Sequence, residues 1–186
     1  MSRHDASVTG SRARGPNRSW PALVGFVLLA ACGARAPGSI PPADLPEPTT
    51  LARTGWPNDW LICPAGACTA PATAAPPAYP VPPERLFAAW REVVSAQPRA
   101  TLIGVDDTRM LLLTQDRTPL LGFIDDVSIR VLPAPDGGST FAAYSRSNVG
   151  MGDFGTNRRR LEQWSAALAR TIGVPAKLPG QTGSGA

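Results

Sequence analysis

Apolar residues recur along the chain with two different periods, and these predict two kinds of element. In residues 84–97 they return every three or four positions, which is the spacing of one helix face. The same spacing returns over Thr156–Ile172, with Leu161, Trp164 and Leu168 on the apolar stripe. Pro98 and Gly173 follow these runs, as expected after a helix C-terminus.

Between the two helices the pattern changes to strands. Val127, Ile129 and Val131 alternate with polar residues, so one face of a sheet should be buried. Four runs are predicted: Thr101–Val105, Met110–Thr114, Leu120–Arg130 and Thr140–Arg146. Their connections are short, which favours antiparallel neighbours. Residues 84–173 are therefore predicted to form an α+β domain: a helix, a four-stranded mainly antiparallel sheet and a helix, with both helices on one sheet face.

The residues around this domain are less regular. Residues 32–83 contain 13 of the 21 prolines, which predicts a proline-rich linker. Within it, Trp60–Ile62 should pack on the domain, because these side chains are costly to expose. Residues 174–186 are expected to form a disordered tail.

Cys63 and Cys68 lie in this segment, separated by four residues. In an exported protein such a pair favours a structural disulfide. Two free thiols remain an alternative, and so does a redox-active pair, although the spacing is not Cys-x-x-Cys.

The N-terminus has the layout of an export signal. A polar stretch with four arginines and one aspartate precedes the apolar run of residues 21–31. Eleven helical residues span about 16 Å, too little for a hydrocarbon core of about 30 Å. The sequence Leu29-Ala30-Ala31-Cys32 resembles the lipobox of bacterial lipoproteins. An ordinary cleaved signal or an uncleaved anchor are the alternatives.

That resemblance implies a signal peptide over residues 1–31 and a lipid such as palmitate on Cys32, the new N-terminus. The protein would then be a lipoprotein of the cell envelope, anchored in the membrane and facing the periplasm. Gly33, rather than Asp, follows the cysteine. In lipoproteins this implies the outer membrane.

Charge and composition then exclude several kinds of binding and catalytic site. The net charge of +4 comes mostly from residues 1–31, and the chain from Cys32 onward carries only +1. This gives no electrostatic argument for binding nucleic acid. The only histidine, His4, also lies in the predicted signal. The rest of the chain therefore cannot form Ser-His-Asp or Cys-His systems or histidine-containing zinc sites. We assign no catalytic residue, metal or cofactor from the sequence.

Two polar segments interrupt the apolar pattern, one at residues 123–127 and the other at residues 144–160. Adjacent strand residues point to opposite faces, which argues against a paired-carboxylate mechanism for Asp125 and Asp126. One aspartate is expected to meet an arginine across the sheet or from the last helix. The candidate residues are Asp125, Asp126, Ser145, Arg146, Ser147, Asp153, Asn157, Arg158 and Arg160.

The same two segments resemble the domain of unknown function 1499 family. Its members carry an Asp-Asp pair in a strand, followed by a Ser-Arg-Ser, Gly, Asp, Gly, Asn-Arg sequence, and the resemblance covers roughly residues 61–169. The chain departs from the pattern at Asn148, where arginine is common, and before Cys68, where many members have Pro-Asn. The family's activity is unknown, so the resemblance supports the fold and implies no chemistry.

Three interpretations of the polar segments follow. They could form a structural Asp–Arg network that fixes the loop before the last helix. They could bind a small anion, such as a lipid headgroup, with arginines and helix amides. They could also serve an Asp-dependent hydrolase. We predict a membrane-tethered, non-catalytic binding or scaffolding domain, with a lipid, a small anion or an envelope protein as partner.

Overall fold

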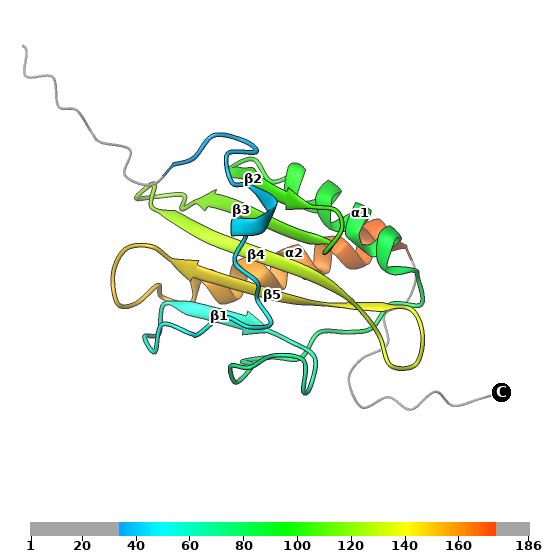
Figure 1. The fold of residues 1–186 in the computed structure, drawn as a ribbon. Coiled ribbons are helices and arrows are strands. Elements are labelled where there is room, and N and C mark those ends of the chain that lie inside the picture. Colours follow the sequence, from blue (N-terminus) through cyan, green and yellow to red (C-terminus); the bar gives the residue numbers. More distant parts are fainter. Residues whose placement is uncertain (1–33, 174–186) are drawn as a thin grey trace, which may run out of the picture. The chain divides into compact units, whose positions relative to one another are not determined.

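The computed structural model describes residues 34–173, so the predicted signal peptide, Cys32 and residues 174–186 lie outside the described residues. The described chain is an α+β domain with a five-stranded antiparallel sheet in the order β1-β5-β4-β3-β2 (Figure 1). The strands are β1 (Asp59–Ile62), β2 (Ala100–Asp106), β3 (Leu111–Arg117), β4 (Ile124–Pro133) and β5 (Ser139–Ser147). The α-helices are α1 (Pro83–Ser95) and α2 (Thr156–Ile172), and a 3₁₀ turn, η1, spans Pro42–Asp44.

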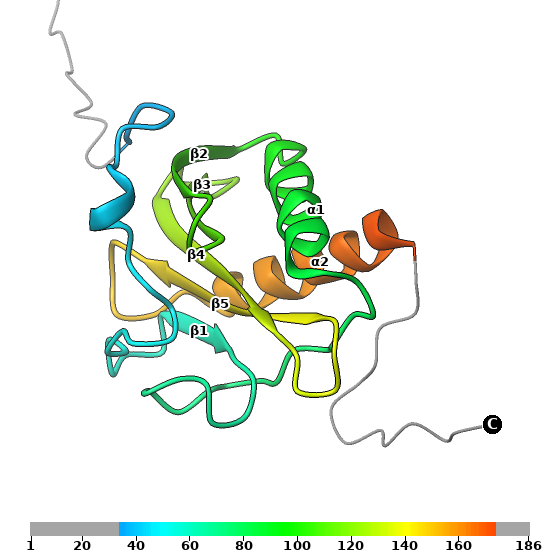
Figure 2. The same cartoon turned by 45° about the vertical axis from the view of Figure 1, so that its right-hand side comes forward.

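Both helices pack on the same face of the sheet (Figure 2), as the sequence predicts. Trp90 of α1 and Trp164 of α2 are buried in one core with sheet residues such as Ile129 and Phe141. The rings of Trp90 and Phe141 meet edge to face, with centroids 4.9 Å apart. This face carries the main hydrophobic core.

The prediction of four strands is wrong by one. β1 has only four residues and is enclosed by Pro57 and Pro64, so it shows no readable alternation. It pairs with β5 at the edge of the sheet, where short strands are common. The expected packing of Trp60–Ile62 is confirmed, because Leu61 and Ile62 are buried and Trp60 is partly buried against the main core.

The predicted start of β4 at Leu120 is also wrong. Leu120 and Leu121 are exposed in the connection after β3, and Gly122 takes a left-handed φ of 66° there. The strand begins only at Ile124. An apolar run is usually a sign of burial, and here it instead forms a loop tip.

The proline-rich segment is irregular, but its described part lies against the domain. Backbone bonds join Gly38 to Leu102 and Ile40 to Ile103, and the side chain of Leu45 is buried on Ile103 and its neighbours. A Cβ atom at Gly104 would collide with Leu45. Residues 38–45 therefore cover the sheet face opposite the helices instead of forming a free linker.

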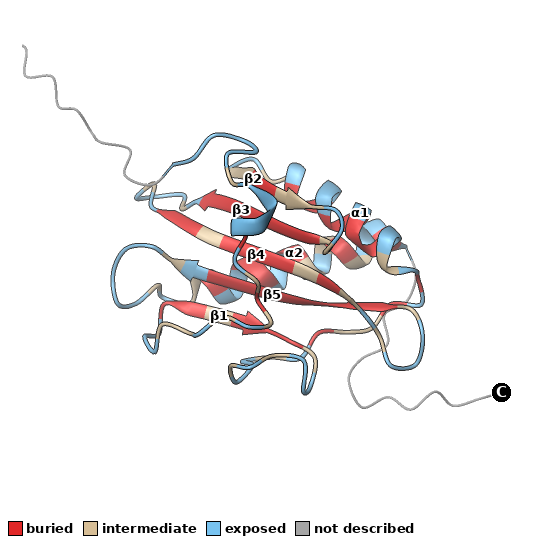
Figure 3. Cartoon of the chain, viewed as in Figure 1, coloured by how far each residue is buried: buried red, intermediate tan, exposed pale blue. Residues whose placement is uncertain are grey.

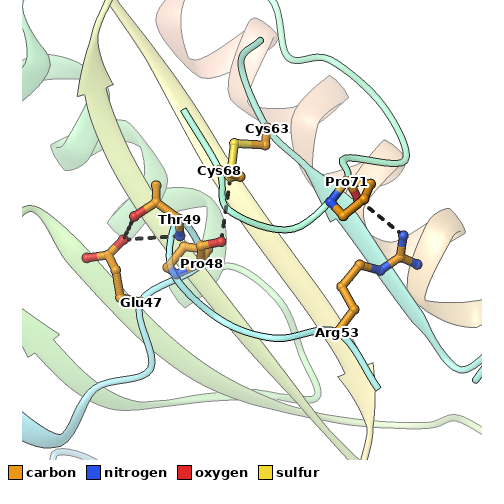
Figure 4. Close-up of a disulfide and its surroundings, with 7 residues drawn as sticks. All are labelled: Glu47, Pro48, Thr49, Arg53, Cys63, Cys68 and Pro71. Atoms are coloured by element: carbon orange, nitrogen blue, oxygen red, sulfur yellow. Dashed lines mark hydrogen bonds between the residues drawn. A yellow bond between two sulfur atoms is a disulfide. The ribbon is translucent and has the colours of Figure 1, made fainter. Parts of the chain in front are cut away.

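A disulfide joins Cys63 and Cys68, as the sequence favours. Figure 4 shows the bridge beside a second irregular stretch, with Cys68 Sγ 3.6 Å from the carbonyl oxygen of Pro48. Cys63 is buried with Leu61 and Tyr144 on the helix-free face. The bridge thus fixes the loop that covers this part of the sheet.

Candidate functional site

Buried polar groups gather at the end of the sheet where β3 stops and β4 starts. Asp125 pairs in register with Asp116 of β3 on one side and with Ser147 of β5 on the other. Every second residue of a strand points to the same face, so these side chains and that of Ser145 face the helices. The first turn of α2 adds Asn157 and Arg160.

Arg160 is the centre of this cluster and is only 5% exposed. Its guanidinium donates to Asp116 Oδ2 at 2.8 Å and to Asp125 Oδ2 at 2.6 Å. It also donates to Ser145 Oγ at 2.9 Å and to Asn157 Oδ1 at 2.7 Å. Two carboxylates therefore share one buried cation, which leaves an excess of negative charge.

Asn157 and Asp153 connect the cluster to the loop before α2. Asp153 accepts bonds from the backbone N–H groups of Gly155 and Asn157 at 2.9 and 2.7 Å, and so caps the helix. The Asn157 amide donates to Asp153 at 2.7 Å and to the Asn58 carbonyl at 2.9 Å. This part of the cluster therefore fixes the backbone of the loop before α2.

Asp125 is the least satisfied member of the cluster. Its side chain is 1% exposed, and no hydrogen bond of normal geometry reaches its Oδ1 atom, although the Ser147 hydroxyl is close enough to stabilise the carboxylate. Burial raises the pKa of this carboxyl, and the nearby Asp116 raises it further, while Arg160 and the Ser147 hydroxyl oppose the shift. The charged form of Asp125 is thus held at a cost in free energy.

A pocket of about 460 Å³ opens beside Asp125. Its walls come from the β3–β4 connection and the β5–α2 loop, with Leu120, Leu121, Phe123 and Phe154 among them. Three polar residues of the cluster, Asp125, Ser147 and Asp153, also line it. The pocket therefore combines an apolar wall with a polar, acidic floor.

The other predicted arginines lie elsewhere. Arg146 and Asp126 point to the helix-free face, where they are 3.7 Å apart. Arg158 is exposed, pairs with Glu162 at 2.7 Å and lies over the Trp60 ring at 5.3 Å. Of the three candidate arginines only Arg160 meets Asp125, so the predicted set divides between two sheet faces.

A second polar cluster, which the sequence analysis missed, lies on the helix-free face. Asp59 accepts bonds from Arg53 Nε at 3.0 Å, from the Thr54 backbone N–H at 3.2 Å and from the Tyr144 hydroxyl at 2.8 Å. Burial alone would raise the pKa of Asp59, but these bonds together lower it below its usual value. Burial and the Asp59 charge raise the pKa of Tyr144.

Asp116 and Asn58 also contact the Arg160 cluster, and the sequence analysis missed both. A signal was present for Asp116, because the polar run Gln115-Asp-Arg117 continues an apolar strand. Asn58 contributes its backbone carbonyl to Asn157, a contact that side-chain chemistry does not foretell. Among the described residues, no group of three or more acidic, cysteine or histidine side chains is placed to hold a metal ion.

Comparison with known proteins identifies the family of the chain. The family described as "Protein of unknown function (DUF1499)" matches residues 43–168. The chain belongs to this family. None of the curated proteins compared with the chain matches it.

Among solved structures, the chain is similar to the one titled "Crystal structure of Ara h 8.0201". The TM-score is 0.39 and the identity 14%, over 52% of this chain and 90% of that chain. These values are too low to support an argument about function. Within the described residues, no helix is long and apolar enough to cross a membrane.

Proposed function

We propose that this protein is a lipid-tethered, non-catalytic binding domain of the bacterial cell envelope, and that the pocket beside Asp125 holds its ligand. The observation that carries the proposal is the combination of an apolar wall with an incompletely partnered carboxylate on the floor. Ligand pockets commonly join apolar walls to a few polar groups that orient the ligand. The lipobox resemblance at Cys32 supports the tether.

The chemistry of the pocket favours an amphiphile with a hydrogen-bond donor or a positive charge. Two of the described residues that line it, Asp125 and Asp153, are acidic, and none is a lysine or arginine. An anion would therefore meet like charge there, which disfavours the anion interpretation of the polar segments.

The hydrolase interpretation finds little support in the same geometry. A general base must be free to take up a proton from the reacting group. Asp125 and Asp116 both engage the guanidinium of Arg160 instead. Asp126, on the other face, is turned away from the pocket.

A dye-displacement experiment tests the binding proposal. The neutral dye N-phenyl-1-naphthylamine should fluoresce on entering the pocket of the purified protein. Leu121→Ser with Phe123→Ser should weaken that signal, whereas the matched remote change Pro135→Ser should not. Dodecylamine should displace the dye better than dodecanol, and dodecanol better than dodecanoate, because the floor is acidic.

Asp125→Asn should reduce the preference for the amine and keep the dye signal, because Asp153 still lines the pocket. Absence of any dye signal sensitive to Leu121 and Phe123 would contradict a pocket ligand. The tether is tested separately, by labelled palmitate on the wild type and on Cys32→Ser. No label on the wild type would contradict the lipoprotein assignment.

A further inference from the structure

The exposed large apolar side chains of the described residues all lie at one end of the sheet. There are seven: Trp56 before β1, Leu120, Leu121 and Phe123 between β3 and β4, and Val149, Met151 and Phe154 after β5. The register brings these segments together, because Asp125 at the start of β4 pairs with the last residues of β3 and β5. The start of β1 pairs with the same end of β5. The loops concerned lie on the left of Figure 1 and are pale blue in Figure 3.

These side chains are difficult to explain by the stability of the fold. Leu120 is 92% exposed and Phe154 is 96% exposed. Phe154 also has a left-handed φ of 53°, which is uncommon for a residue other than glycine. Scattered apolar residues on a surface need no explanation, but a group confined to one end of a domain marks an interaction surface.

The described chain begins at this same end of the sheet (Figure 1). The backbone N–H of Arg35 donates to Gln115 Oε1 at 2.8 Å, and Gln115 lies two residues before the end of β3. Cys32 precedes Arg35 by three residues. Three residues reach at most about 10 Å, so a lipid on Cys32 would enter the membrane close to the apolar loops.

The charge at this end fits an anionic membrane surface. Exposed arginines surround the loops: Arg35, Arg99, Arg117, Arg146 and Arg159. Among these five described side chains, only Arg146 has an acidic partner, Asp126. Basic residues near a bilayer are attracted to anionic lipid headgroups, and aromatic residues favour the interface between headgroups and acyl chains.

We infer that this end of the domain docks on the lipid bilayer, with the tips of the β3–β4 and β5–α2 loops inserted among the headgroups. The inference rests on the proposed lipid tether. The domain would then lie directly on the membrane instead of at the end of a long spacer. The pocket, which lies between the same loops, would open toward the lipid.

Fluorescent labels at single positions of the full lipidated protein test the orientation. Leu120→Cys and Phe154→Cys place an environment-sensitive fluorophore on the two loops, and Pro135→Cys places it on the β4–β5 turn at the other end of the sheet. Each protein is reconstituted in phosphatidylethanolamine vesicles with phosphatidylglycerol. The two loop labels should shift to the blue and be quenched by nitroxide lipids, and the label at position 135 should do neither.

Charge and partner choice are tested with the same labels. Arg99→Gln with Arg117→Gln should reduce quenching at the loops, whereas Arg170→Gln, near the far end of α2, should not. Loop labels that stay unquenched on an acylated, vesicle-bound protein would overturn docking and leave the tether intact. A blue shift that appears without vesicles and grows with protein concentration would indicate that a second copy of this chain is the partner. That result would also overturn docking on the membrane. Missing acylation together with quenched loops would overturn the tether alone.

Discussion

Two buried carboxylates lie on opposite faces of one sheet, and they differ in how completely their oxygens are partnered. Asp59 receives bonds from a cation, a backbone amide and a tyrosine, and its pKa is lowered. Asp125 shares Arg160 with a second carboxylate, keeps one oxygen without a partner, and its pKa is raised. Both oxygens of Asp59 are partnered, as in a structural network. Asp125 keeps a buried oxygen without a partner and belongs to a residue set that lines a pocket, which is the difference expected between a structural network and a binding site.

The removal of Arg160, the cation shared by Asp116 and Asp125, should distinguish the two clusters most clearly. Arg160→Met would leave Asp116 and Asp125 buried without their partner, and we expect a loss of about 3 to 5 kcal/mol in the free energy of unfolding. Urea denaturation measures this loss. The control Arg158→Met, two residues away and exposed, should cost far less. Equal losses would show that the buried position of Arg160 is energetically unimportant.

Asp59→Asn should cause the next largest loss in the free energy of unfolding, about 2 kcal/mol, because it weakens charge-assisted hydrogen bonds. The lowered pKa sets the pH dependence. The stabilisation by Asp59 is present above its unfolded pKa, about 3.9, and disappears as the pH falls through the lower folded value. Denaturation from pH 2 to 6 should therefore show wild type and variant converging in acid. A constant gap would contradict the lowered pKa.

Asp125→Asn should have a smaller effect, within about 1 kcal/mol, because Arg160 keeps Asp116 as a partner. The pH dependence of the stabilisation by Asp125 has the opposite sign to that of Asp59. A raised folded pKa means that the contribution of Asp125 to stability is present in acid and is lost as the pH rises through that value. The stability difference should then shift in favour of Asn as the pH rises above the unfolded pKa of about 3.9. A shift in the opposite direction would place Asp125 in the same class as Asp59.

Asp126→Asn gives the smallest expected change, roughly 0.5 kcal/mol or less, because its pair with Arg146 is partly solvent-exposed. Thermal unfolding at low and high salt checks this, and any loss should vanish at high salt. A loss as large as that of Asp125→Asn would mean that the two neighbouring aspartates contribute equally to stability, although they lie on opposite faces of the sheet.

The sequence predicts most of the fold because the helices and central strands have a clear period. α2 has the predicted bounds, and the prediction that both helices share a sheet face is confirmed. β1 is missed because four residues between prolines show no period, and its pairing with β5 depends on distant residues.

The candidate site is predicted only in part. Asp125, Ser145, Asn157 and Arg160 do come together. Arg158 does not join them, because a cation near the start of a helix can point outward to a partner one turn later, as it does to Glu162. The pocket could not be predicted, because its wall is made of apolar residues that also fit a strand pattern.

The pairing of β1 with β5 also bears on the order in which the chain can fold. Asp59 and its partner Arg146 are separated by most of the described chain, so their contact has a high sequence separation. Such contacts form late and slow the folding of β-rich domains. A nascent chain that has emerged only as far as β4 offers β1 only its local bridge from Ile62 to Ala74. The strand partners of Leu61 and Ile62, residues 144 and 143, arrive only with β5.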